Sequence, residues 1–313
     1  MDQRKLIQHG PSSLTIAIPK KWLDQRNLKK GDTLFTNQEG NKVIFSTQES
    51  LSLDKIEIDL NKLDRTSLLL YIQSLYRFGY NEIDVTFPIT AMHYRKNAQV
   101  PTSKVIHDIV NRCMGFEIID QKETSLKIKY MGKEEGEDFK AILRRAFLLI
   151  NETSVSLLEG IKNNDKNLIN SIEEKHDNIN KFVNYALRLL NKYGYPDVKK
   201  TSFYYHIIAS LDKIVDVLKY NARSLEKYNK QCKKETIDIW SQINESIRNY
   251  YELFYSFDLI KIDQLSKNRD HVKNNLQKYI KKIPQEELIL LTKMTQILEI
   301  ILDLTDFRMG LEY

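Results

Sequence analysis

Cysteine is scarce in this chain of 313 residues: only Cys113 and Cys232 occur, far apart and outside any CxxC pair. Two such cysteines fit a reducing compartment and exclude a cysteine-based zinc site. No run approaches the roughly 18 apolar residues that a membrane span needs. The start, MDQRKLIQHG, lacks the apolar stretch of a signal peptide. We therefore expect a soluble, cytoplasmic protein without membrane insertion.

Catalytic signatures are missing as well. The chain contains no GxSxG, GxxxxGK[ST], GxGxxG or HExxH motif. Nothing in the sequence argues for catalysis, and we expect a protein that is not an enzyme. Hydrophobic residues make up 42% of the chain, which is enough for packed cores and too much for a disordered protein.

Glycine and proline are concentrated in the first part of the chain. After residue 140, proline occurs only at Pro196 and Pro284, and glycine only at three positions. Because these two residues punctuate turns, the first part is expected to be turn-rich and the second helical. A chain of this length is also expected to hold more than one domain.

The patterns predict a multi-domain fold with three regions. Residues 1–48 indicate short strands around one helix, with a strand at 14–18 and a hairpin centred on Glu39 and Gly40. Residues 53–133 indicate a small α/β domain with strands at 56–60 and 82–87, helices at 67–79 and 103–115, a loop at 89–102 and a closing hairpin. Residues 136–313 indicate an all-α region. Its six predicted helices span about 136–163, 166–194, 198–229, 235–258, 260–282 and 285–312.

The six helices form an internal repeat of three, about 136–229 and 235–312. A shift of 93 residues places Asn151 on Asn244 and Asp177 on Asp270, and a shift of 87 places Asp216 on Asp303. The repeat predicts two three-helix bundles side by side.

Pairs of carboxylates four residues apart mark the helices of this repeat. They are Glu173 with Asp177, Asp212 with Asp216, and Glu299 with Asp303; Asp270 stands alone, because Ser266 takes the place of Glu173 in the second half. Carboxylates that converge between helices need cations to neutralise them, and such oxygen ligands favour Fe, Mn or Mg ions. The alternative is that each pair lines a solvated helix face. His176 is expected at the surface or beside such a site, and His206 in the core or between helices.

Positive charge is concentrated at the start of the chain. Residues 1–30 carry a net charge of +5, out of +6 for the whole chain. Such a concentration is typical of a surface that binds a polyanion. The alternative is a dimerisation module with an ordinary basic surface.

The stretch RKLIQHGPSSLTIAIPKKWLDQRNLKKGD resembles the AbrB/SpoVT/MazE group, through Gly10, Ile18, Pro19 and the Gly31-Asp32 turn among others. The resemblance implies a swapped-hairpin β-barrel built by two chains, and hence a homodimer that binds DNA. Members of the group often carry arginines after the Ile-Pro segment, where this chain has Leu23 and Asp24. The implied DNA contacts are therefore Arg4, Lys5, Lys20, Lys21 and Arg26.

The helical region is similar to PhoU, through the Glu173 and Asp212 motifs, Asn221-Ala222 and the Glu299 motif. With the opening unit and the α/β segment, the whole chain looks like an archaeal phosphate uptake regulator. This implies a pair of three-helix bundles with metal sites on Glu173, Asp177, Asp212, Asp216, Asp270, Glu299 and Asp303.

Three functions follow as hypotheses. The first is a DNA-binding transcriptional regulator of phosphate uptake. The second is an adaptor that acts on a phosphate transporter ATPase or its signalling kinase, with the first unit only dimerising. The third is a carboxylate-metal enzyme.

Overall fold

The computed structural model describes residues 3–39, 42–47, 55–132 and 139–313. The chain divides into two compact units, Met1–Ser52 and Leu53–Tyr313. The second unit includes both the α/β segment and the helical region, so these two parts form one body.

The N-terminal unit consists of two short hairpins and one helix. Strand β1 (Ile7–Gln8) pairs with β2 (Leu14–Thr15), and β3 (Phe35–Glu39) pairs with β4 (Lys42–Ser46). Helix α1 (Lys20–Gln25) starts after Pro19, whose fixed φ suits the entry to a helix. The predicted helix and the two strands of the predicted hairpin are confirmed, while Gly40 of its turn lies outside the described residues. The strand predicted at 14–18 is shorter, because only its first two residues find a partner. The described residues of one chain form two separate sheets and no closed barrel.

The α/β segment is a four-stranded sheet covered by two helices. Its strand order is β5 (Lys55–Asp59), β6 (Glu82–Thr86), β10 (Ser125–Tyr130) and β9 (Phe116–Gln121), and only the β5–β6 pair is parallel. Helices α2 (Arg65–Phe78) and α3 (Thr102–Val110) pack on the apolar side of the sheet. Helix α2 ends at Gly79 with φ 117°, a conformation that glycine adopts without strain. This segment is called the α/β layer below.

Two predictions for the α/β layer are wrong. Residues 89–102 are not a loop: β7 (Thr90–His93) and β8 (Ala98–Pro101) form a hairpin around the 3-10 turn η1 (Tyr94–Lys96). Asn97 closes this turn in the left-handed region, which asparagine tolerates. The helix predicted at 103–115 ends earlier, at Val110, and a turn carries the chain to Gly115.

The helical region contains the six predicted helices. They are α4 (Phe139–Asn163), α5 (Lys166–Tyr193), α6 (Val198–Glu226), α7 (Lys234–Tyr255), α8 (Leu259–Tyr279) and α9 (Gln285–Gly310). The breaks between helices lie within about three residues of the predicted positions, and Gly194, Pro196 and Pro284 stand in two of them. No helix in the described part of the chain is long and apolar enough to cross a membrane.

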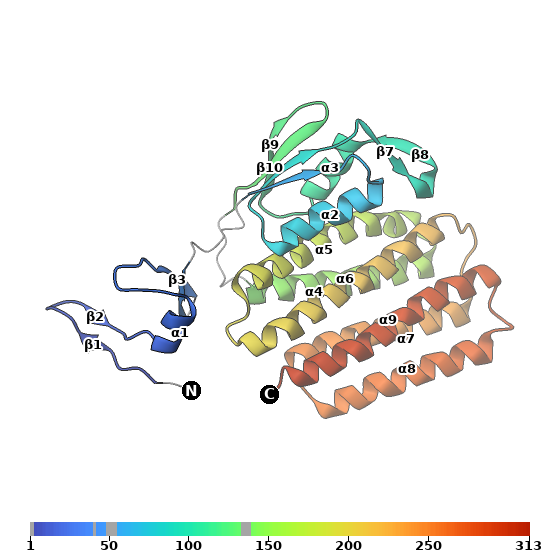
Figure 1. Cartoon of the computed structure of the whole chain (residues 1–313). Helices are drawn as coiled ribbons and strands as arrows, with labels where there is room; N and C mark the ends of the chain where they lie inside the picture. Colours follow the sequence, from blue (N-terminus) through green and yellow to red (C-terminus); the bar gives the residue numbers. More distant parts are fainter. Residues whose placement is uncertain (1–2, 40–41, 48–54, 133–138) are drawn as a thin grey trace. The chain divides into compact units, whose positions relative to one another are not determined.

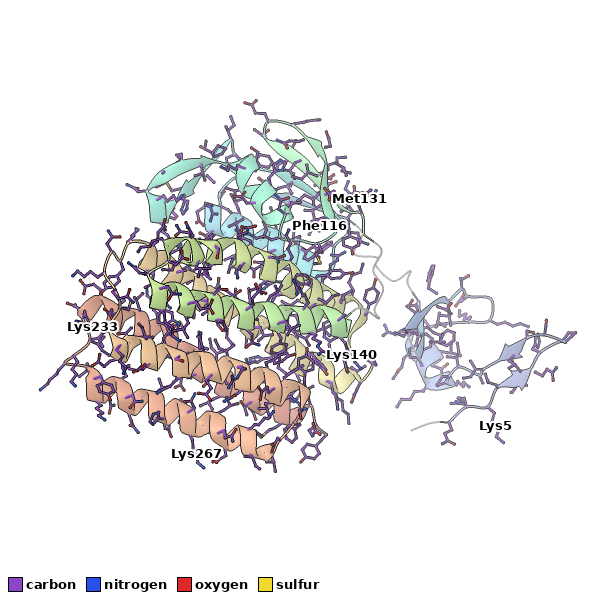
Figure 2. All side chains as sticks on the ribbon, turned by 180° about the vertical axis from the view of Figure 1, so that it is seen from behind. Lys5, Phe116, Met131, Lys140, Lys233 and Lys267 are labelled. Carbon is purple, nitrogen blue, oxygen red and sulfur yellow. The ribbon has the colours of Figure 1, made fainter. Side chains whose placement is uncertain are left out.

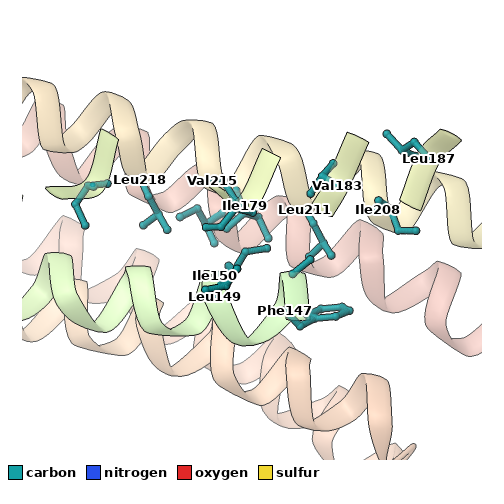
Figure 3. Close-up of a cluster of buried hydrophobic side chains, with 14 of the residues drawn as sticks. Phe147, Leu149, Ile150, Ile179, Val183, Leu187, Ile208, Leu211, Val215 and Leu218 are labelled. Carbon is teal, nitrogen blue, oxygen red and sulfur yellow. The ribbon is translucent and has the colours of Figure 1, made fainter. Parts of the chain in front are cut away.

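The helices pack as two neighbouring sets of three. Helices α4, α5 and α6 pack on one another, as do α7, α8 and α9, and the α4–α7 and α6–α9 contacts join the two sets. Figure 1 shows the resulting layers of the second unit, with α2 on α5 at one side and α8 at the other. Between α4, α5 and α6 lies a core of leucine, isoleucine, valine and phenylalanine side chains, among them Phe147, Val183 and Leu211 (Figure 3). We call the two sets the first and second bundles.

Equivalent caps support the internal repeat. Asp165 begins α5 and accepts hydrogen bonds from the backbone N–H groups of Asn167 and Leu168. Asp258, 93 residues later, begins α8 and accepts the N–H of Ile260. An aspartate at this position satisfies backbone donors that the first turn leaves without a partner. The same local solution therefore starts the middle helix of each bundle.

Candidate functional site

A row of buried polar side chains runs along α5. His176, Asn180, Asn184 and Arg188 follow one another every four residues, and each is at most 5% exposed. Buried polar groups are costly unless they are hydrogen-bonded, so this row needs partners. We call it the polar stripe of α5. Its partners lie on α6 and on the α/β layer.

Arg188 joins the helical region to the α/β layer. Its guanidinium donates hydrogen bonds to the carbonyl oxygens of Tyr76 and Tyr80 and to Oδ1 of Asn81, at 2.6–3.0 Å. The same group lies over the rings of Tyr76 and Tyr130, with the nearer centroid at 4.5 Å. A fully buried arginine with this set of acceptors fixes how α5 and the sheet pack together. Figure 2 places Phe116, another ring in this contact, in the α/β layer.

Each of the four predicted carboxylates of the first bundle is paired with a basic side chain. Arg77 of α2 binds Asp212 at 2.9 Å, and Arg112, which follows α3, binds Asp177 at 2.9 Å. Within the bundle, Lys219 binds Asp216 at 2.6 Å, and Arg223 makes a two-pronged contact with Glu173. We call these eight residues the charge network. Two of its four cations come from the α/β layer, so the network joins two parts of the unit.

His176 holds two of these carboxylates together. Its Nδ1 lies 2.9 Å from Asp177 and its Nε2 lies 3.1 Å from Asp216, so α5 and α6 meet at this ring. The prediction of a surface histidine is wrong, because the side chain is only 3% exposed. The alternative prediction, that His176 lies beside the acidic residues, agrees with these contacts. His206, by contrast, is exposed and stacks on Phe307 of α9, so it lies between helices and not in the core.

The electrostatics of the network favour charged carboxylates. Burial by itself would raise the pKa of Asp216, but hydrogen bonds from His176 and Lys219 outweigh it and hold the pKa well below its usual range. Burial also raises the pKa of Asp177 and of Glu173, but their partners outweigh it. His176 and Arg112 lower the pKa of Asp177, and Arg223 lowers that of Glu173. The network is therefore an internally neutralised set of charges near neutral pH.

The second bundle repeats the arrangement in a reduced form. Arg269 occupies the position equivalent to His176 and contacts both Asp270, at 2.8 Å, and Glu299, at 3.6 Å. Lys273 adds a contact to Glu299 at 2.6 Å. Asp303 is exposed and has no ion-pair partner among the described residues. A basic residue thus joins α8 to α9 where a histidine joins α5 to α6.

The donor set does not fit a metal ion as it is arranged. No group of three or more His, Cys, Asp or Glu side chains is placed to hold one within residues 3–39, 42–47, 55–132 and 139–313. The physical reason is that Arg and Lys side chains neutralise the acidic residues that a metal would need. A metal ion would have to displace at least two of these cations, so the metal centre stays a prediction.

The predicted DNA contacts lie in the N-terminal unit, on exposed positions. Arg4 and Lys5 precede β1, and Lys20 and Lys21 open α1. Arg26 follows α1 directly. Lys5, Lys20, Lys21 and Arg26 have no carboxylate partner in the described part of the chain. Figure 2 labels Lys5 in this unit.

Sequence reasoning missed the basic half of the charge network and the polar stripe. Arg77 lies 135 residues before Asp212, and Arg112 lies 65 before Asp177. No local pattern links residues so far apart. The polar stripe does leave a signal, since a polar residue every fourth position interrupts the otherwise apolar faces of α5.

No protein-family model matches the chain, and no curated protein matches it.

Proposed function

We propose that the protein is a DNA-binding regulator of phosphate uptake that acts as a homodimer in the cytoplasm. The observation that carries the proposal is the surface of the N-terminal unit. None of its described side chains is buried in a single chain, and eight of its large apolar side chains are exposed. These are Leu6, Ile7, Leu14, Ile16, Phe35, Val43, Ile44 and Phe45.

Apolar surface of this kind needs a partner. A unit of about fifty residues cannot be stable when it buries none of its own side chains. Its two hairpins leave strand edges that a second copy can pair with. A swapped-hairpin barrel made by two chains, as the resemblance to the AbrB/SpoVT/MazE group implies, would cover these residues.

The charge of the unit supports the DNA contact. Lys20 and Lys21 stand at the first turn of α1, and Arg26 follows its end. Pairing of two copies would double this charge. Exposed Lys and Arg side chains without carboxylate partners are the groups that contact phosphates of a duplex. Asp24 on the same helix is the residue that argues for the alternative, an adaptor without DNA binding. The proposal requires neither a metal ion nor catalysis.

The test begins with fragmented DNA from the source organism. The purified full chain is incubated with the fragments at about 0.15 M salt, and retained fragments are sequenced. One enriched fragment is then titrated by fluorescence anisotropy. We expect Lys20→Ala with Lys21→Ala to weaken binding by about tenfold or more, because two phosphate contacts per chain are lost.

The matched control removes two lysines from α8, as Lys267→Ala with Lys278→Ala, and should bind as the wild type does. The proposal fails if no fragment is enriched, or if the Lys20 and Lys21 variant binds like the wild type. Recovery of a transporter ATPase or kinase with the chain, without any enriched DNA, would favour the adaptor instead.

A further inference from the structure

Four arginines from separate segments gather where the α/β layer meets the first bundle: Arg95 and Arg223 lie at one tyrosine ring, and the charges of Arg112, Arg223 and Arg95 repel that of Arg65. Arg65 is the first residue of α2, Arg95 lies in η1, Arg112 follows α3, and Arg223 belongs to α6. We call them the arginine cluster. Arg112 belongs both to this cluster and to the contacts that hold the α/β layer on α5.

The ring of Tyr220 shows how closely these segments approach. Arg95 lies 5.3 Å from the ring centroid and Arg223 lies 5.7 Å from it. Lys219 lies 4.8 Å from the same centroid. Three cations therefore lie around one ring, each within the distance at which cation–π attraction acts.

Arg65 is the least satisfied member. Its side chain is partly buried, and among the described residues it has no hydrogen-bond or ion-pair partner. Burial lowers its pKa, and repulsion from Arg112 adds to this, against a smaller opposing effect of Asp108. Burial lowers the pKa of His93, and the positive charge of Arg65 lowers it further. The same excess of positive charge therefore acts on a second side chain.

The carboxylates nearby do not use all the donors of the cluster. Arg112 donates a hydrogen bond from Nη2 to Asp177, but its Nε–H is buried without a partner among the described residues. Arg223 is matched by Glu173. Arg65, which is half-buried, and Arg95, which is exposed, add two further guanidinium groups with no carboxylate partner in the described part of the chain. An unmatched buried donor is costly, so an acceptor with several oxygens would stabilise this arrangement.

We propose that the arginine cluster binds a phosphate group, either as free inorganic phosphate or as part of a phosphate ester. Planar guanidinium forks pair with phosphate oxygens through two parallel hydrogen bonds, and a doubly charged anion can satisfy more than one fork. Because the cluster bridges η1, α2 and α6, an anion there would also strengthen the contact between the α/β layer and the first bundle. This inference deepens the proposed function. The binding of phosphate does not depend on that function; only the role of the bound anion in regulation rests on it.

The experiment measures anion binding by the full chain. Isothermal titration at pH 7.5 in about 0.15 M sodium chloride uses inorganic phosphate, ATP and sulfate in separate runs. The variant Arg65→Gln with Arg95→Gln removes the two forks that lack carboxylate partners and leaves the charge network intact. The control, Arg145→Gln with Arg248→Gln, removes equal charge from α4 and α7. Circular dichroism checks that both variants keep the wild-type helix content.

We expect the wild type to bind phosphate or ATP more tightly than sulfate. The Arg65 and Arg95 variant should lose about tenfold or more in affinity, and the control should not change. Tighter binding of phosphate than of ATP would identify the free anion as the ligand, and the reverse would identify an ester. Absence of binding by the wild type, equal loss in the control, or sulfate bound as tightly as phosphate would overturn the proposal.

The outcome is separable from that of the DNA experiment. A chain that binds phosphate through the cluster but retains no DNA fragment would sink the proposed function alone. A chain that retains DNA but binds no phosphate anion would sink this inference alone.

Discussion

At the scale of single residues, each acidic side chain of the charge network is paired with a basic side chain. Asp216 illustrates the consequence, because its carboxylate accepts a hydrogen bond from Lys219 and lies 3.1 Å from Nε2 of His176. Its pKa is lowered in the folded state, so it stabilises the fold above the unfolded-state pKa of about 3.9. That contribution is lost as the pH falls below this value.

Asp216→Asn should therefore make the free energy of unfolding depend less strongly on pH in the acid range. We expect the free energy of unfolding at pH 7 to fall by about 2 kcal/mol, since Lys219 loses its counter-ion in a buried position. Between about pH 5 and 2 the wild type should lose more stability than the variant. Urea denaturation at several pH values measures both. Asp303→Asn, which removes an exposed carboxylate of α9, is the control. Parallel curves for the wild type and Asp216→Asn would contradict the assignment.

At the scale of elements, one helix supplies the cap of another. Helix α7 begins after Lys233, whose side chain makes no capping hydrogen bond. Glu287 of α9, which is fully buried, accepts the backbone N–H of Lys233 at 3.0 Å and the hydroxyl of Thr236. It also accepts the hydroxyl of Tyr228. A carboxylate at this end of a helix also faces the positive end of the helix dipole.

Glu287→Ala should lower the free energy of unfolding by about 3 kcal/mol, because three donors lose their acceptor at once. Glu286→Ala, a neighbouring exposed carboxylate, should change it by less than about 0.5 kcal/mol. Chemical denaturation gives the two values. Hydrogen exchange should accelerate first in the opening turn of α7, and equal exchange there in both variants would argue against this cap.

The elements also show which parts of the fold can be predicted from sequence. The six helices were predicted with ends within about three residues of those observed, because apolar periodicity is sustained and Gly194, Pro196 and Pro284 interrupt it. The β7–β8 hairpin was missed because four-residue strands carry too little alternation, and one of them ends in a proline. The acidic residues of the site were found from their spacing. Their cations were not, because Arg77 and Arg112 reach them only through tertiary packing.

At the scale of the whole molecule, the two units differ in how much apolar surface they bury. Leu14 of the N-terminal unit is 63% exposed in a single chain. If a second copy covers it, sedimentation equilibrium should give twice the chain mass of 36.9 kDa. Leu14→Asp should shift the mass towards that of one chain at the same concentration, because a buried unpaired carboxylate opposes association.

Leu259→Asp tests whether the second unit, and not the N-terminal unit, holds two copies together. Leu259 is 69% exposed at the start of α8, so this variant adds the same charge to the second unit. It should sediment like the wild type. A wild-type chain with the mass of one copy, or a Leu14→Asp variant that keeps the doubled mass, would contradict the homodimer.

The four-residue spacing of the polar stripe has a geometric consequence for α5. Each residue turns the helix by 100°, so a step of four overshoots a full turn by about 40°, and three such steps rotate the stripe by about 120°. His176 at one end therefore faces Asp216 of α6, whereas Arg188 at the other end faces Tyr76 of the α/β layer. One helix thus changes its polar neighbour along its length. A single residue inserted between Asn180 and Asn184 would turn one half against the other by about 100°, so His176 and Arg188 could no longer meet their partners at the same time.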